Sequence, residues 1–177
     1  REIRRRSRFG CVICRSGFYQ YEHIDPEFED ATVHDPAHIC CLCGSCHDAV
    51  TRGQRSKASV GAAYRTIQST PLAEVSKPVG PIDFYGGNAI LSIGGLRYSQ
   101  AVQTVLKNYG QNVISVIPGQ GDTPGTISAI FTDEFGIPVL KLVENAWEGS
   151  TLNWDIEVVG PCITVRRAAG AVALKLR

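Results

Sequence analysis

Short apolar runs separated by Gly and Pro fill the second half of the chain. Runs of this kind, bounded by turn-forming residues, are typical of β-strands. In the last run Val172, Leu174 and Leu176 alternate with Ala173 and Lys175, which is the period of a strand with one buried face. The pattern therefore predicts a β-sandwich or open barrel of roughly seven or eight strands. The expected strands lie near residues 90 and 93 and over 113–117, 127–131, 139–143, 156–159, 163–165 and 172–176.

The first part of the chain follows other patterns. Aromatic and apolar residues gather over 18–24 and again over 38–42, and both segments predict short strands. Ser45 is placed to cap a short helix that ends near Gly53. Small strands and a short helix bury little apolar surface, so this part of the chain needs another source of stability.

A longer helix is indicated by Val60, Ala63, Tyr64 and Ile67, which recur at the spacing of one helix face after Ser59, a candidate N-cap. Several prolines follow this pattern, and they predict a linker. The fold class expected from these patterns is α+β. Its parts are a small N-terminal domain with its following helix at 1–70, a Pro-rich linker at 71–83 and a β-rich accessory domain at 84–177.

Composition places the chain among soluble globular proteins, with 44% hydrophobic and 20% charged residues. No apolar run reaches the roughly 20 residues that span a bilayer, and no apolar segment follows the Arg-rich start, so we expect neither a membrane partner nor a secretory signal. The net charge of +1 disfavours a generally basic surface. Arg4, Arg5, Arg6 and Arg8 nevertheless form a local cluster suited to nucleic-acid phosphates, the alternative being a solvated chain end.

Cysteines are concentrated near the N-terminus, where they form two pairs with the spacing C-x-x-C: Cys11 with Cys14, and Cys43 with Cys46. Each pair closes a tight turn, and four thiolates complete the tetrahedral shell of one Zn²⁺. The odd total of seven cysteines and their uneven distribution disfavour a disulfide framework and indicate a reducing compartment, hence the cytoplasm. The remaining cysteines are expected to be free core thiols: Cys40, Cys41 and Cys162.

The same stretch contains all four histidines, His23, His34, His38 and His47, and Glu22 directly precedes the first of them. Phosphodiester hydrolysis needs a base for water and a cation for the charge that builds up on the phosphate. A neutral imidazole suits the first task near pH 7, and a carboxylate with an imidazole can hold a divalent ion. These residue types would make a minimal metal-assisted hydrolase, but on residue types alone histidines in ordinary structural contacts are the more common case.

In their order and spacing these motifs resemble HNH endonucleases. The matching segments are FGCVIC at 9–14, YEHI at 21–24, ICCLCGSCH at 39–47 and TRG at 51–53. They are similar to the four-cysteine, zinc-binding branch of the ββα-metal superfamily, and the resemblance covers about residues 1 to 60. It implies a small treble-clef-like domain, followed here by an all-β domain.

The resemblance also implies roles for single residues. His23 matches the general base, and Glu22 and His47 match the ligands of a catalytic Mg²⁺ or Mn²⁺. The middle motif position, often Asn, falls on His38, with His34 as the competing candidate. The position of Glu22 is more often Asp. Neighbours in a regular strand point to opposite faces, so Glu22 and His23 would need a local distortion to act together.

The function implied by the resemblance is metal-dependent hydrolysis of DNA, with a structural Zn²⁺ held by the four paired cysteines. The alternative is a catalytically lapsed, zinc-containing module that binds nucleic acid or protein. A dithiol redox protein is disfavoured, because two pairs some thirty residues apart suit a metal better than thiol exchange. The β region could position the substrate, bind a protein partner or mediate self-association. The resemblance is compatible with two biological roles, defence against foreign DNA and the movement of mobile elements, and the sequence does not choose between them.

Overall fold

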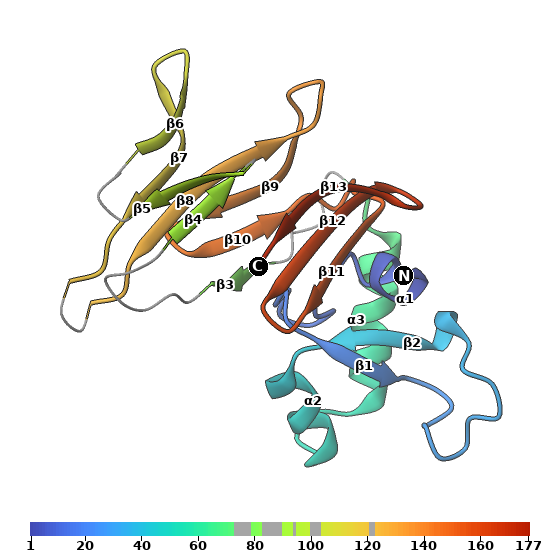
Figure 1. The fold of residues 1–177 in the computed structure, drawn as a ribbon. Coiled ribbons are helices and arrows are strands. Elements are labelled where there is room, and N and C mark those ends of the chain that lie inside the picture. The colour runs from blue at the N-terminus through green and yellow to red at the C-terminus, as the bar shows by residue number, and fades with distance from the viewer. Residues whose placement is uncertain (73–78, 83–89, 94, 100–103, 121–122) are drawn as a thin grey trace. The chain divides into compact units, whose positions relative to one another are not determined.

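The computed structural model shows a mixed α+β protein with few helices and many strands, in agreement with the predicted class. The described residues are 1–72, 79–82, 90–93, 95–99, 104–120 and 123–177. They form two compact units: a terminal unit, made of Arg1–Gly80 and Gly149–Arg177, and a middle unit, Pro81–Glu148 (Figure 1). Among the described helices, none combines the length and apolar character needed to cross a membrane.

The terminal unit begins with helix α1 (Glu2–Arg6) and the first cysteine pair. Strand β1 (Gln20–His23) then pairs antiparallel with β2 (Ile39–Leu42), so both strands predicted in this region are confirmed. A short 3-10 helix, η1 (Pro36–His38), leads into β2. Helix α2 (Gly44–Thr51) follows β2 almost at once, so the second cysteine pair lies at the end of the hairpin.

Cys43, and not the predicted Ser45, is the N-cap of α2. Its backbone is extended, and its Sγ accepts a hydrogen bond from the N–H of Cys46 at 3.4 Å. Ser45 already belongs to the first turn of the helix. The prediction failed because a cysteine, which is not a usual cap, acts here as both cap and member of a C-x-x-C pair.

Helix α3 (Lys57–Ser69) likewise begins earlier than predicted, since Ser56 and not Ser59 is its N-cap. The Oγ of Ser56 accepts the N–H of Ser59 at 3.1 Å, which places Ser59 inside the first turn. The predicted apolar face is confirmed, and in Figure 1 the helix passes behind the β1–β2 hairpin. The buried cluster between them contains Val60, Tyr64, Ile67, Cys40 and Leu42.

Three strands at the end of the chain also belong to the terminal unit: β11 (Asp155–Val159), β12 (Cys162–Ala168) and β13 (Ala171–Leu176). They form an antiparallel sheet in the order β11-β12-β13. The residues predicted as one domain at 84–177 are therefore divided between the two units. The physical reason is a set of polar contacts between α1 and this sheet.

Arg4 of α1 makes most of these contacts. Its Nε and Nη2 donate to the two carboxylate oxygens of Asp155 at 3.0 and 2.8 Å, and its Nη1 lies 3.0 Å from Glu157 Oε1. Nη1 of Arg166 bonds to the same two acids, at 3.2 and 3.0 Å. Asp155 is only 2% exposed, so these two guanidinium groups replace the water that its charge would otherwise need.

Most of a sheet with the strand order β3-β10-β9-β8-β7-β6 lies in the middle unit, as does the separate hairpin β4–β5; of β3, only Pro81 belongs to this unit. Asp133 closes the β8–β9 turn by accepting N–H bonds from Phe135 and Ile137, and Gly136 supplies the positive φ of 78° that this turn requires. The strands are β3 (Val79–Pro81), β4 (Ile90–Ile93), β5 (Leu96–Ser99), β6 (Thr104–Asn108), β7 (Gln111–Ile117), β8 (Thr126–Thr132), β9 (Pro138–Val143) and β10 (Ala146–Gly149).

Every predicted strand of the β region has a counterpart, and the observed strands are mostly longer. Strands β3, β5, β6 and β10 were not predicted, because each is only three to five residues long and such short patterns are weak signals. Trp147 of β10 and Leu140 of β9 are almost fully buried. Of the predicted linker, residues 73–78 and 83 lie outside the described residues.

Candidate functional site

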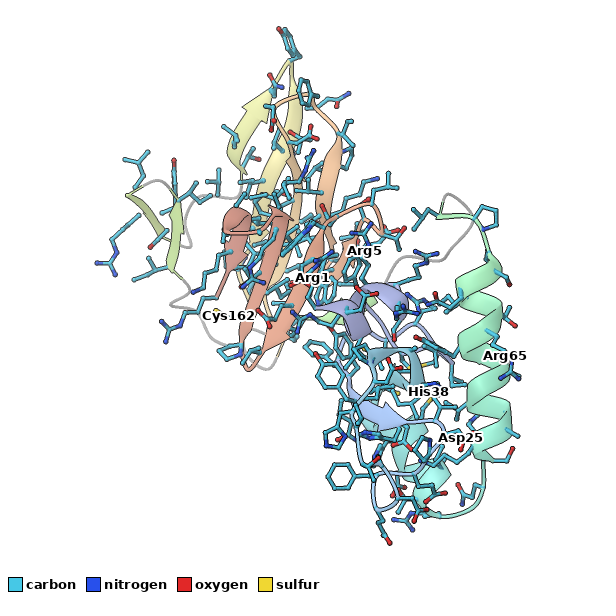
Figure 2. All side chains as sticks on the ribbon, turned by 90° about the vertical axis from the view of Figure 1, so that its right-hand side faces the viewer. Arg1, Arg5, Asp25, His38, Arg65 and Cys162 are labelled. Atoms are coloured by element: carbon cyan, nitrogen blue, oxygen red, sulfur yellow. The ribbon has the colours of Figure 1, made fainter. Side chains whose placement is uncertain are left out.

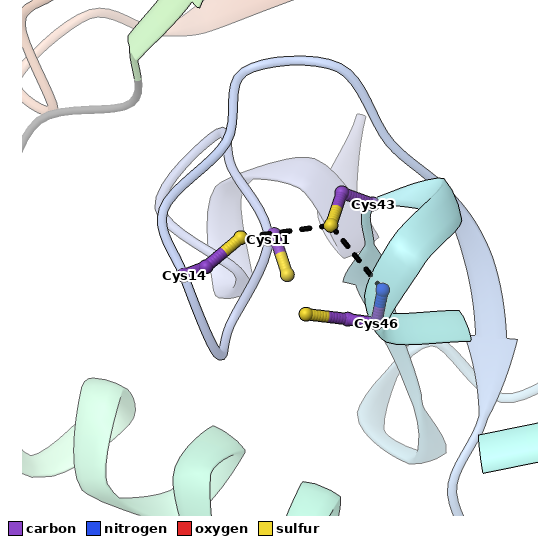
Figure 3. Close-up of side chains that lie close together, drawn as sticks. All are labelled: Cys11, Cys14, Cys43 and Cys46. Atoms are coloured by element: carbon purple, nitrogen blue, oxygen red, sulfur yellow. Dashed lines mark hydrogen bonds between the residues drawn. The ribbon is translucent and has the colours of Figure 1, made fainter. Parts of the chain in front are cut away.

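Four cysteine side chains converge at one point of the terminal unit; we refer to them as the thiol cluster (Figure 3). Cys11 and Cys14 come from the turn after α1, and Cys43 and Cys46 come from the start of α2. The four Sγ atoms all lie within 4.8 Å of one another, and those of Cys14 and Cys43 are 3.5 Å apart. Tetrahedral zinc with Zn–S bonds of about 2.3 Å needs sulfurs about 3.8 Å apart. The thiol cluster could therefore hold a structural metal such as zinc.

Arg15 stabilises the turn that carries the first cysteine pair. Its φ of +64° reverses the chain, and its guanidinium donates to the carbonyls of Arg8, Ser7 and Cys11 at 2.6, 3.0 and 3.2 Å. Burial lowers the pKa of Arg15 to about 10. This role could not be predicted from the sequence, because an arginine beside an Arg-rich segment carries no sign that its side chain will turn inward.

The thiols of the cluster differ in how readily they ionise. Burial raises the pKa of the Cys14 and Cys46 thiols, and the neighbouring cysteines raise it further. Burial opposes the ionisation of Cys11 as well, but backbone N–H donors, that of Cys14 first, lower its pKa below the ordinary value. A central cation would stabilise all four thiolates, since thiol ligands bind metals in the deprotonated form.

The other cysteines are free thiols, as predicted. Cys40 and Cys41 lie fully buried on β2, and burial raises the pKa of each to about 12, so both stay neutral at physiological pH. Cys162 is half-buried on β12. These residues pack as small apolar side chains.

A second polar cluster lies at the end of β1; we refer to Glu22, His47 and Lys57 as the Glu22 cluster. Glu22 is 6% exposed, and its Oε2 lies 3.0 Å from His47 Nε2. Its Oε1 accepts a hydrogen bond from Lys57 Nζ, which also donates to the carbonyl of His23 at 2.6 Å. The structure thus brings together the two residues predicted as ligands of the catalytic ion. It adds Lys57, the first residue of α3, which the predicted cap at Ser59 would have left outside the helix.

Glu22 and His47 have the spacing of neighbouring ligands on an octahedral ion, because bonds of about 2.1 Å at right angles put two ligand atoms about 3 Å apart. Mg²⁺ is commonly held by one or two carboxylates together with water and substrate phosphate. Within the described part of the chain, only the thiol cluster brings three or more His, Cys, Asp or Glu ligand atoms this close together. Glu22 and His47 therefore fit an ion that other ligands must complete, and Lys57 already neutralises the carboxylate.

The imidazole of His23 has different neighbours from Glu22. Its Nε2 lies 3.0 Å from Nδ1 of His34, and its ring meets that of Phe28 edge-on with centroids 5.3 Å apart. Phe28 in turn stacks on His34, with centroids 5.5 Å apart and an angle of 9° between the rings. β1 pairs with β2 in regular register through Glu22 and His23, so the two side chains diverge as in an ordinary strand.

His38, predicted for the middle motif position, forms a hydrogen bond to the residue after β1 through its backbone. Its carbonyl accepts the N–H of Ile24 at 2.8 Å, and its side chain is exposed (Figure 2). The imidazole beside His23 is that of His34, the competing candidate.

Two side chains of the predicted basic cluster, those of Arg4 and Arg6, are paired with acidic residues of the protein. Arg4 is 12% exposed and bonded to the acids of β11, and Arg6 pairs with Glu2 at 2.9 Å. The backbone of Arg8 is in the left-handed region, with its carbonyl bonded to Arg15. Arg5 is exposed on α1 (Figure 2).

Comparison with known proteins gives no relative: no protein-family model matches the chain, and no curated protein or solved structure matches it significantly. The similarity to HNH endonucleases therefore stays a prediction. The function has to be inferred from the thiol cluster, the Glu22 cluster and the histidines of β1 and its following loop.

Proposed function

We propose that this protein is a metal-dependent endonuclease of the HNH type, which hydrolyses DNA phosphodiester bonds. The observation that carries the proposal is the 3.0 Å contact between Glu22 on β1 and His47 on α2. His47 directly follows Cys46, so a metal in the thiol cluster would fix the helix start that presents His47. The element order strand, strand, helix supports the same proposal.

His23 would act as the general base. Its Nε2 bonds to Nδ1 of His34, and in a pair of neutral imidazoles one of these nitrogens is the donor and the other the acceptor. When His23 donates, its own Nδ1 carries no proton and is free to accept one from water. In that tautomer the contact with His34 would hold the His23 ring in place while Nδ1 accepts the proton.

Glu22 and His47 would hold a divalent ion, with phosphate oxygens and water as further ligands. When bound, such an ion would neutralise the charge that develops on the phosphate and on the leaving oxygen. The base need not touch these residues, because in an in-line displacement the attacking and leaving oxygens lie on opposite sides of phosphorus. Glu22 and His23 point to opposite faces of β1, which is compatible with a base on one side of the phosphorus and an ion on the other.

Nicking of supercoiled plasmid in Mg²⁺ or Mn²⁺ tests the proposal. We expect ion-dependent nicking by the wild-type protein and a rate about 10²- to 10⁴-fold lower for His23→Ala, since a positioned base contributes about that much. His38→Ala is the matched control, because it removes an exposed imidazole nearby. Its rate should stay close to that of the wild type, and both variants should keep their zinc. A wild-type protein that cleaves no DNA with either ion would contradict the proposal.

One observation favours the alternative, a lapsed module that binds nucleic acid or protein: the ammonium of Lys57 lies on the carboxylate that the ion would need. In that case the plasmid stays intact with the wild-type protein and with both variants. Retention of labelled DNA in a filter assay would then identify nucleic acid as the ligand.

A further inference from the structure

The backbone of the terminal unit determines where Lys57 lies. It is the first residue of α3, directly after the Ser56 cap, on a helix whose apolar face is buried against the hairpin. Its Nζ bonds at once to the carboxylate of Glu22 and to the carbonyl of His23. The Lys57 side chain is 29% exposed, so it is partly covered by protein and partly open to solvent.

The charges of the Glu22 cluster are already balanced without any ion. Glu22 supplies one negative charge, Lys57 supplies one positive charge, and His47 adds none when neutral. A divalent ion on the same carboxylate would face the ammonium at a distance of a few ångströms. Repulsion between charges this close is strong in a site that is partly shielded from water.

We propose that Lys57 is the built-in counter-ion of Glu22, and that a divalent ion binds there only when the ammonium is displaced. This inference rests on the proposed function and deepens it. A DNA phosphate supplies the missing negative charge, since it can accept the ammonium and ligate the ion at the same time. Ion and DNA should therefore each raise the affinity for the other, by the same factor.

Binding of Mn²⁺ to the full-length, zinc-loaded protein without DNA tests this, with free Mn²⁺ measured by electron paramagnetic resonance. We expect Lys57→Met to bind Mn²⁺ roughly tenfold tighter than the wild type or more, because it keeps an unbranched side chain of similar bulk and removes the repelling charge. The double variant with Glu22→Gln should lose this binding, which would place the ion at Glu22. Equal zinc content and thermal midpoint would show that the folds are comparable.

Arg52→Met is the matched control. It also removes one positive charge from the terminal unit, but Arg52 is 67% exposed and pairs with Asp48 on α2 instead of Glu22. We expect its Mn²⁺ affinity to equal that of the wild type. An equal gain in both variants would indicate a general charge effect and overturn the proposal.

Addition of a short DNA duplex, in the His23→Ala background to prevent cleavage, completes the test. With Lys57 present the duplex should raise Mn²⁺ affinity by about tenfold or more, and with Lys57→Met the gain should be clearly smaller. The proposal is wrong if Lys57→Met binds Mn²⁺ no tighter than the wild type or not at all. If the wild type still nicks plasmid in that case, only the role of Lys57 is refuted; if it does not, the proposed function is refuted as well.

Discussion

The thiol cluster and the Glu22 cluster lie in the same unit but differ in how complete they are. The thiol cluster offers four ligand atoms, enough to satisfy zinc without help from solvent or substrate. The Glu22 cluster offers two ligand atoms and an ammonium in contact with one carboxylate. A closed ligand set suits an ion that stabilises the fold, and an open one suits an ion that shares its shell with substrate. The difference separates a structural site from a candidate catalytic one.

The largest effect is expected from removal of one member of the thiol cluster. Cys43→Ser should abolish zinc binding and unfold the terminal unit, because structural zinc supplies about 10–16 kcal/mol in small zinc domains. The middle unit, Pro81–Glu148, should keep its protection. Zinc analysis measures the metal content, and hydrogen exchange followed by mass spectrometry measures the protection of each unit. Cys162→Ser is the control, with zinc retained. Native protection at residues 11–46 in zinc-free Cys43→Ser would remove the structural role of the metal.

A moderate effect is expected from the Glu22 cluster. Glu22→Gln should lower the free energy of unfolding by about 1–3 kcal/mol, because the amide leaves Lys57 without a charged partner in a partly buried site. The zinc content should not change. Urea unfolding followed by circular dichroism measures the effect, and Glu29→Gln, at an exposed position of the loop after β1, is the control. A loss of zinc in Glu22→Gln would show that the two clusters depend on each other.

The smallest effect is expected at the start of α3. Ser56→Ala should cost about 1 kcal/mol, the usual contribution of a serine N-cap, since it removes the acceptor for the N–H of Ser59. Ser59→Ala, at the position predicted as the cap, should cost less. Urea midpoints of both variants give the comparison. The reverse order would place the true cap at Ser59 and would weaken the case that the helix start holds Lys57 in place.

Local features of the structure, and the long-range contacts that a known motif implies, could be predicted from the sequence; other long-range contacts could not. The two C-x-x-C pairs, strands β1 and β2 and the apolar face of α3 all follow from spacing over a few residues. Lys57 meets Glu22 across a separation of 35 residues, and Arg4 meets Asp155 across 151. No periodicity connects such partners.

The histidines and the caps show two other limits. The meeting of Glu22 and His47 was anticipated through the family resemblance, whereas the pairing of His23 with His34 depends on the course of a loop without regular structure. The cap of α2 was misplaced because Cys43 is not a usual cap residue, and that of α3 because two serines, Ser56 and Ser59, stand near the helix start. The position of the cap matters because it determines which side chains lie in the first turn; with Ser56 as the cap of α3, Lys57 is the first residue of the helix.

The chain leaves the terminal unit after Gly80 and re-enters it at Gly149, which has a consequence for biosynthesis. On a ribosome the first 80 residues emerge well before β11 is made, so Arg4 stays without Asp155 while the middle unit is translated. All four members of the thiol cluster are available once Cys46 has emerged. Capture of zinc by the nascent chain would thus protect the early segment until its carboxyl-terminal strands arrive.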